Sequence, residues 1–260
     1  MVMQSRGVSD SIVVFDSGVG GLNLLAKCVK LMPEKHYYYI SDNRNVPYGN
    51  RSANEVYNLV ISALNGIESL NPQALVIACN TATALCIDKL RARFSFPVVG
   101  IQPAIKQAAA VGGRCLVLAT ERTVNSPSFL SLASRFSDLN IRVVGCKLLA
   151  GFVEENIFNL PEVLPTGLLP ELCVDSVVLG CTHYAFVSGQ ISKFYSCPVF
   201  DGIEGTANRC SKICGMSDHY LPQPGKADHF DYNKLKITFI GGETTKNEKI
   251  LKYLFGLMTK

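Results

Sequence analysis

The sequence has little charge imbalance and no block of basic residues. Its 260 residues include 25 lysines and arginines against 21 aspartates and glutamates, which gives a formal net charge of +4. Proteins that bind nucleic acid usually concentrate lysine and arginine on one face or in one run. The sequence therefore gives no reason to expect a nucleic-acid partner.

Long apolar runs are also missing. No stretch reaches the roughly 20 apolar residues that a membrane-spanning helix needs, and the N-terminal segment MVMQSRGVSDS lacks the apolar core of a signal peptide. Hydrophobic residues nevertheless make up 48% and charged residues 18%, a composition that excludes disorder. Ten cysteines without a secretory signal predict free thiols, a reducing cytoplasmic setting and no membrane association.

Short apolar, β-branched runs alternate with helical patterns, which predicts an α/β fold with mostly parallel sheets. The helix starts include a capping box at Ser52 and Glu55, and Ser126 followed by Pro127. A closing helix is expected over 243–258 and a loop over 217–232. The predicted strands are Ser11–Phe15, His36–Ser41, Ala74–Ala78, Val98–Ile101, Arg114–Ala119, Ile141–Gly145, Ser176–Leu179, Pro198–Phe200 and Lys236–Ile240.

An internal repeat divides the chain into two similar halves. Residues 74–81 read ALVIACNT and residues 176–183 read SVVLGCTH, so each half has an apolar strand followed by a cysteine. The strands before each cysteine, and the Pro-Val pairs after it, recur at closely matching spacings. We therefore expect a first α/β domain of residues 1–99 plus 207–260 and a second of residues 100–206.

Ligands of open α/β sheets bind beyond the carboxyl ends of the strands, so polar residues there are candidates for a site. The first such end carries Asp16 followed by Ser17 and three glycines, opening a helix whose N-terminus favours an anion. The run matches neither a dinucleotide fingerprint nor a P-loop. A tight turn with Asp16 capping the helix is the alternative interpretation.

Cys79 and Cys181 occupy equivalent strand-to-helix junctions. A helix N-terminus can lower a thiol pKa from about 8.5 to about 3.5–7.5, so both cysteines are candidates for reactive thiols rather than core residues. Two symmetric thiols suit a racemase, which removes a proton from one face of a carbon and returns it to the other. His183 lies two residues after Cys181, where both side chains share one face of an extended segment. No metal is expected, because Cys210, Cys214, His219 and His229 lack the usual zinc-finger spacing.

Five segments, IVVFDSGVGGLNLL, YYYISDNRNVPYGNRS, LVIACNTATAL, VVGIQP and LGCTHYAF, resemble the signature blocks of glutamate racemases, in the same order. The resemblance implies two pseudo-symmetric three-layer α/β domains with the active site in the cleft between them. It implies cofactor-independent interconversion of L- and D-glutamate, supplying peptidoglycan synthesis. Cys79 and Cys181 would be the two acid/bases, with Cys79 acting on D-glutamate and Cys181 on L-glutamate.

The same resemblance assigns further roles by position. Asp16, His183 and Glu154 would assist the two thiols, and Asp16 and His183 would also contact substrate. The remaining substrate-binding residues would be Ser17, Tyr48, Gly49, Asn80, Thr81, Thr120 and Thr182. The wider superfamily leaves two alternatives open, namely a racemase for aspartate or several amino acids, and, in another class, a two-lobed amino-acid sensor. A homodimer is possible, and Asp42 and Glu154 could instead be solvated loop carboxylates.

Overall fold

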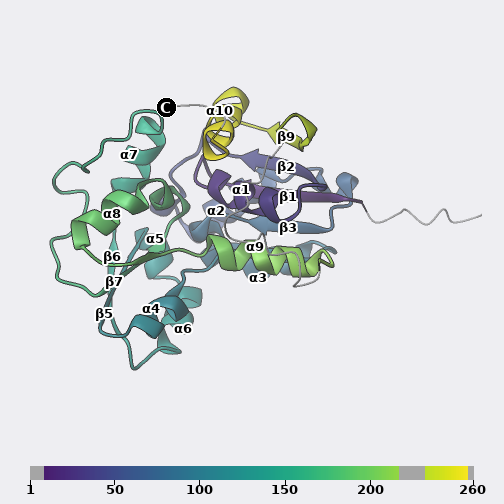
Figure 1. Ribbon diagram of the computed structural model, residues 1–260. Helices are drawn as coiled ribbons and strands as arrows, with labels where there is room; N and C mark the ends of the chain where they lie inside the picture. The colour runs from purple at the N-terminus through teal and green to yellow at the C-terminus, as the bar shows by residue number, and fades with distance from the viewer. Residues whose placement is uncertain (1–8, 217–231, 257–260) are drawn as a thin grey trace, which may run out of the picture.

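The computed structural model describes residues 9–216 and 232–256. The fold within them is built on two sheets, each made of parallel strands (Figure 1). The first sheet has five strands in the order β4-β3-β1-β2-β9, and the second has four in the order β6-β5-β7-β8. Every strand pairing within the described residues is parallel, which confirms the predicted α/β class.

All nine predicted strands are present, and each begins and ends within one residue of its predicted bounds. The first sheet contains β1 (Ser11–Asp16), β2 (His36–Ser41), β3 (Ala74–Ile77), β4 (Val98–Gly100) and β9 (Lys236–Ile240). The second contains β5 (Arg114–Ala119), β6 (Asn140–Gly145), β7 (Ser176–Gly180) and β8 (Val199–Phe200). The central strands β1, β3 and β7 are buried along their whole length, as expected for strands covered on both faces.

Helices cover both faces of each sheet. Along β1, Ile12 and Val14 pack with α1, α9 and α10, whereas Val13 and Phe15 pack with α2 and α3, because successive side chains of a strand point to opposite faces. These helices are α1 (Leu22–Leu31), α2 (Ala53–Ala63), α3 (Asn80–Arg93), α9 (Ile203–Ile213) and α10 (Thr244–Leu254). The first half is therefore a three-layer unit, as predicted.

The second half repeats this arrangement. Leu116 and Leu118 of β5 face α7 (Leu149–Asn156) and α8 (Ser188–Tyr195), while Cys115 and Val117 face α4 (Ile105–Val111) and α6 (Pro127–Ser134). Shorter elements complete the unit: α5 (Glu121–Val124) and the 3-10 helix η3 (Thr182–Val187). The apolar cluster around α1 continues into the one around α7 and η3, so the two halves share a core.

The predicted helix starts are confirmed. Ser52 Oγ accepts the Glu55 N–H at 3.3 Å while Glu55 Oε2 accepts the Ser52 N–H at 2.8 Å. Ser126 Oγ likewise accepts the Phe129 N–H at 3.1 Å, with Pro127 at the first helical position. The closing helix is shorter than predicted: it ends at Leu254 because Gly256 adopts a left-handed φ of 71°. Of the predicted loop, residues 217–231 lie outside the described residues, and Tyr232 begins a short 3-10 helix, Tyr232–Lys234.

The C-terminal part of the chain returns to the first sheet. After β8 the chain enters α9, which packs on α1, and β9 then pairs with β2. In Figure 1 the yellow α10 lies above the first sheet on the side of α7. The division into residues 1–99 plus 207–260 and residues 100–206 stays a proposal. None of the described helices is both long and apolar enough to cross a membrane.

Candidate active site

The carboxyl ends of β1, β3 and β7 converge on one narrow cavity between the halves, whose volume accessible to a water-sized molecule is about 20 Å³. Cys79 follows β3 and Cys181 follows β7, and both thiols line this cavity. The other predicted site residues that line it are Ser17, Tyr48, Gly49, Asn80, Thr81, Thr120, Thr182 and His183. Asp16 and Glu154 lie just behind its wall.

Cys79 is a buried thiol at the first residue before α3. Its Sγ lies 3.6 Å from Ser17 Oγ. Burial, together with the negative charge of Asp16, raises the pKa of Cys79 to about 12. The expected lowering of this pKa by the helix N-terminus is therefore wrong, because desolvation and a neighbouring carboxylate outweigh the helix.

Cys181 has a different neighbour. Its Sγ lies 3.9 Å from His183 Nδ1, and His183 Nε2 lies 2.7 Å from Glu154 Oε2. Burial lowers the pKa of His183, but hydrogen bonds and charges from Cys181 and Glu154 raise it well above its ordinary value. A cation thus lies beside Cys181, whereas an acid lies beside Cys79. The two equivalent cysteines therefore have opposite electrostatic surroundings.

The contact between Cys181 and His183 was expected, but its geometry differs from the prediction. Only Cys181 is extended, with φ −148° and ψ 132°, and His183 already belongs to the 3-10 helix η3. The turn of that helix, rather than a shared strand face, brings the imidazole back to the sulphur.

Asp16 is fully buried at the end of β1. Its Oδ1 accepts the Gly18 N–H at 2.8 Å, and its Oδ2 accepts the Thr182 hydroxyl at 3.0 Å. Burial raises the pKa of Asp16 to about 6, although the charge of His183 and these hydrogen bonds oppose the rise. The alternative interpretation of a helix cap is wrong, because α1 begins after Gly21 without a side-chain cap.

The glycine turn after Asp16 binds a carboxylate, and that carboxylate is the side chain of Glu154. Val19 N–H donates to Glu154 Oε2 at 3.0 Å. A Cβ on Gly18 would lie 2.5 Å from the same oxygen, and one on Gly20 would lie 2.4 Å from Thr182 Oγ1. The glycines therefore let the second half approach the turn closely. Glu154 is buried rather than solvated.

Two further contacts hold residues of the cavity wall in place. Thr81 Oγ1 of the first half lies 3.0 Å from Thr120 Oγ1 of the second. The Tyr48 hydroxyl donates to Asp42 Oδ2 at 2.8 Å, so Asp42 orders the segment that carries Tyr48 and Gly49. Asp42 thus contacts the cavity wall and is not a free loop carboxylate.

Sequence reasoning missed several participants. Val46, Pro47 and Ala150 also line the cavity, and Thr123 joins the contact between Thr81 and Thr120. Asn43 and Lys246 bind Glu154. Asn43, Val46 and Pro47 lie in the segment YYYISDNRNVPYGNRS, but the resemblance assigns them no role of their own. The others belong to none of the five segments, and tertiary packing alone brings them there. Within the described residues no cluster of three His, Cys, Asp or Glu side chains could hold a metal ion, and His219 and His229 lie outside that part of the chain.

Comparison with known proteins agrees with this geometry. Residues 17–210 match the family model described as Asp/Glu/Hydantoin racemase. A glutamate racemase of Clostridium acetobutylicum is 36% identical over 208 residues, which cover 76% of this chain and 81% of the relative. Glutamate racemase 2 of Bacillus subtilis is 36% identical over 213 residues, covering 76% and 80%.

Solved structures give the same result. The structure of Escherichia coli glutamate racemase in complex with L-glutamate and the activator UDP-MurNAc-ala aligns with a TM-score of 0.74 at 27% identity, covering 95% of this chain and 94% of that one. Because the family model spans most of the chain and curated relatives exceed 30% identity, the chain belongs to the Asp/Glu/hydantoin racemase family.

Proposed function

We propose that this protein is a glutamate racemase, which interconverts L- and D-glutamate without a cofactor by moving a proton between two thiols. The observation that carries the proposal is that Cys79 and Cys181, from equivalent strand ends, line one cavity. The names of the curated relatives support glutamate as the substrate. D-Glutamate supply for peptidoglycan synthesis is the role typical of such enzymes.

The different surroundings of the thiols suggest how the cycle starts. The pKa of Cys79 is raised to about 12 and that of Asp16 only to about 6, so the proton stays on the Cys79 sulphur rather than moving to Asp16. Cys79 therefore begins as the proton donor. Cys181, whose sulphur lies 3.9 Å from His183 Nδ1, is the partner that removes the α-proton of L-glutamate in this direction.

The proton movements then balance. Cys181 sulphur takes the α-proton of L-glutamate, and the resulting carbanion takes the Cys79 thiol proton on its opposite face, giving D-glutamate. Cys79 is left as a thiolate and Cys181 as a thiol, which is the form that accepts D-glutamate for the reverse reaction. The negative charge of Asp16, which lies behind the cavity wall, favours binding of the substrate ammonium without touching it. The Glu154–His183 pair holds the imidazole beside the Cys181 sulphur.

Polar groups of the cavity wall supply the substrate contacts in this proposal. Among the residues that the structure describes, the buried Asn80 Nδ2 has no hydrogen-bond partner, so it is available to a substrate carboxylate. Hydroxyl groups of the cavity wall and the backbone around Gly49 complete the set: Ser17, Tyr48, Thr81, Thr120 and Thr182. All ten cysteines are free thiols, which supports the expected cytoplasmic setting.

Solvent exchange tests the proposed function. When the protein is incubated with L-glutamate in D2O, we expect the α-proton signal in the NMR spectrum to disappear as D-glutamate carrying deuterium accumulates. The reason is that the proton returned by the second thiol comes from solvent-equilibrated sulphur. The same assay with L-aspartate should show much slower exchange. Faster exchange with aspartate would change the substrate, and binding of glutamate without any exchange would contradict the enzyme.

Substitution of Gly18 by alanine should disable the site without unfolding the protein. The new Cβ would lie 2.5 Å from Glu154 Oε2 and 3.1 Å from His183 Nε2, so the carboxylate must move away from the imidazole. We expect kcat to fall roughly 100-fold, as displacements of about 1 Å in a catalytic array can cause. Gly205→Ala is the matched control, because no atom of residues 9–216 or 232–256 lies within 4 Å of its Cβ position. Equal activity of the two variants would contradict the role given to the Gly18 contact.

A further inference from the structure

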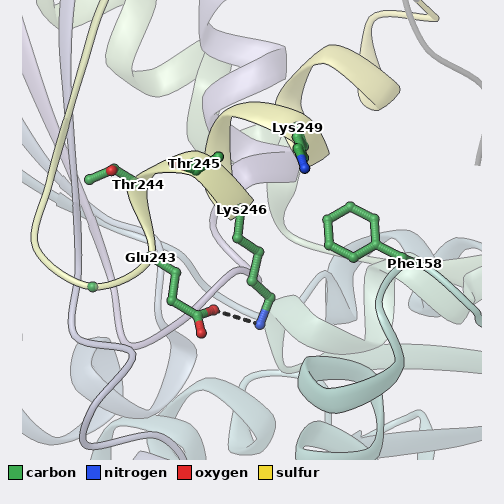
Figure 2. A pocket seen from close by; sticks show the side chains of 7 residues that line it. Phe158, Glu243, Thr244, Thr245, Lys246 and Lys249 are labelled. Atoms are coloured by element: carbon green, nitrogen blue, oxygen red, sulfur yellow. Dashed lines mark ion pairs between the residues drawn. The ribbon is translucent and has the colours of Figure 1, made fainter.

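The C-terminal helix α10 reaches the site through one lysine. Lys246 Nζ lies 3.4 Å from the Glu154 main-chain oxygen, 3.4 Å from Glu154 Oε1 and 2.9 Å from Glu243 Oε2. Figure 2 shows Lys246 extending from the first turns of α10 to Glu243, while Lys249 projects from the same helix beside Phe158. Lys246 therefore connects a helix that covers the first sheet to a residue of the second half.

Glu154 is held at both carboxylate oxygens. Oε2 contacts His183 Nε2 and the Val19 N–H, at 2.7 and 3.0 Å. Oε1 accepts from Asn43 Nδ2 at 3.1 Å and from Lys246 Nζ at 3.4 Å. Because a carboxylate is planar and rigid, fixing Oε1 also fixes the direction in which Oε2 meets the imidazole.

The positive charge of Lys246 stabilises the ionised Glu154 carboxylate that its contacts hold in place. Burial would raise the pKa of Glu154, but His183, the Val19 N–H and Lys246 together lower it to about 2. Glu243 and Glu154 in turn raise the pKa of Lys246 against the effect of burial, so the ammonium is retained. The Lys246 side chain is about one quarter exposed, whereas that of Glu154 is only 10% exposed.

We propose that Lys246 is a positioning residue for the reaction. It holds the Glu154 carboxylate so that His183 remains directed at Cys181, and it does so without lining the substrate cavity. This inference rests on the proposed racemase function. It assigns to α10 a part in catalysis that no motif of the sequence indicates.

The test compares Lys246→Met with Lys249→Met, two substitutions that remove one charge each from the same helix. Lys246→Met should lower kcat about 10-fold, by analogy with the roughly 10–100-fold losses that follow removal of the outer partner of a metal-binding histidine. KM should stay within about twofold, because Lys246 does not line the cavity. Since the two enantiomers have equal free energy in water, kcat/KM must fall by the same factor in both directions, which checks the assay internally.

Two more measurements separate positioning from a merely structural role. Lys246→Arg, which keeps the charge, should recover most of kcat, and thermal midpoints should show that all variants are folded. In protein labelled with ¹⁵N at histidine, the imidazole signals of His183 should shift in Lys246→Met and remain unchanged in Lys249→Met.

Each result bears on the proposal. A Lys246→Met variant with wild-type kcat and wild-type His183 signals would overturn it, as would an equal loss of kcat in Lys249→Met. An arginine variant as impaired as the methionine variant, with His183 signals like those of the wild type, would also reject it. If the wild-type protein itself failed to exchange the glutamate α-proton, the proposed function would fail. The His183 signals would then still decide whether Lys246 acts through Glu154.

Discussion

Replacing either Cys79 or Cys181 by alanine is expected to abolish racemisation while the protein stays folded. Inversion needs one group to remove the proton and another to supply it from the opposite face, and each variant keeps only one of the two thiols. General acid or base groups contribute up to about 10⁴-fold each, so the rate should fall by roughly 10⁴ or more in both directions. Polarimetry from each pure enantiomer measures the loss directly.

Cys86→Ala is the matched control for this experiment. Cys86 is a buried thiol on α3, as Cys79 is at the start of that helix, but it does not line the cavity. We expect near-normal racemisation from Cys86→Ala. Its thermal midpoint should change by about as much as that of Cys79→Ala. Wild-type racemisation rates in either of the other two variants would refute the two-thiol mechanism.

Asp16→Asn should lower kcat by roughly 10²–10⁴-fold, the range typical of groups whose charge takes part in proton transfer. The asparagine oxygen can still accept the Gly18 N–H, and Thr182 can accept from the new amide, so the local hydrogen bonds survive. The variant therefore removes the charge and little else. A kcat that remains normal in both directions would restrict Asp16 to holding the turn.

The pH dependence gives this prediction a second readout. The pKa of Asp16 is about 6 in the folded protein, so kcat/KM of the wild type should rise as pH increases through about 6, and the Asn variant should lack that rise. The unfolded pKa is about 3.9, so the group favours folding when protonated and lowers stability as pH rises through this interval. Asp16→Asn should consequently be no less stable than the wild type at pH 7.

Asp201→Asn serves as the control for Asp16→Asn. Asp201 Oδ1 accepts the Ile203 N–H at 2.9 Å, the same two-residue turn that Asp16 makes with Gly18, and burial also raises its pKa. It does not line the cavity between the halves. Its substitution should leave kcat and the pH profile unchanged.

The parts of the site that could be predicted from sequence are those fixed by local pattern. Cys79 and Cys181 follow short, β-branched apolar runs that predict buried strands, and parallel strands place the residues after them at one edge of a sheet. The same reasoning located Asp16 and Thr182. Their ionisation could not be predicted, because the pKa of Cys79 depends on burial and on a carboxylate that is distant in sequence.

The parts that could not be predicted depend on the approach of the two halves. Glu154 was placed by resemblance, but the pattern did not show that its carboxylate would occupy the glycine turn through the Val19 N–H. Lys246 lies in no signature segment. Asn43 lies in one, but nothing in that segment shows that its amide meets Glu154. The length of α10 was overestimated because helical periodicity continues past the glycine that ends it.

The pairing of β9 with β2 has a consequence for synthesis on the ribosome. β2 ends at Ser41 and its partner β9 begins only at Lys236, so at about 5–20 residues per second the edge of the first sheet waits tens of seconds for its last strand. During that interval the whole second sheet, from β5 to β8, has already been translated as one continuous segment. The second half can therefore complete its fold first and serve as the surface on which α10 and β9 close the first. The nascent chain exposes the β2 edge throughout this time, which leaves the strand open to pairing with other chains until β9 covers it.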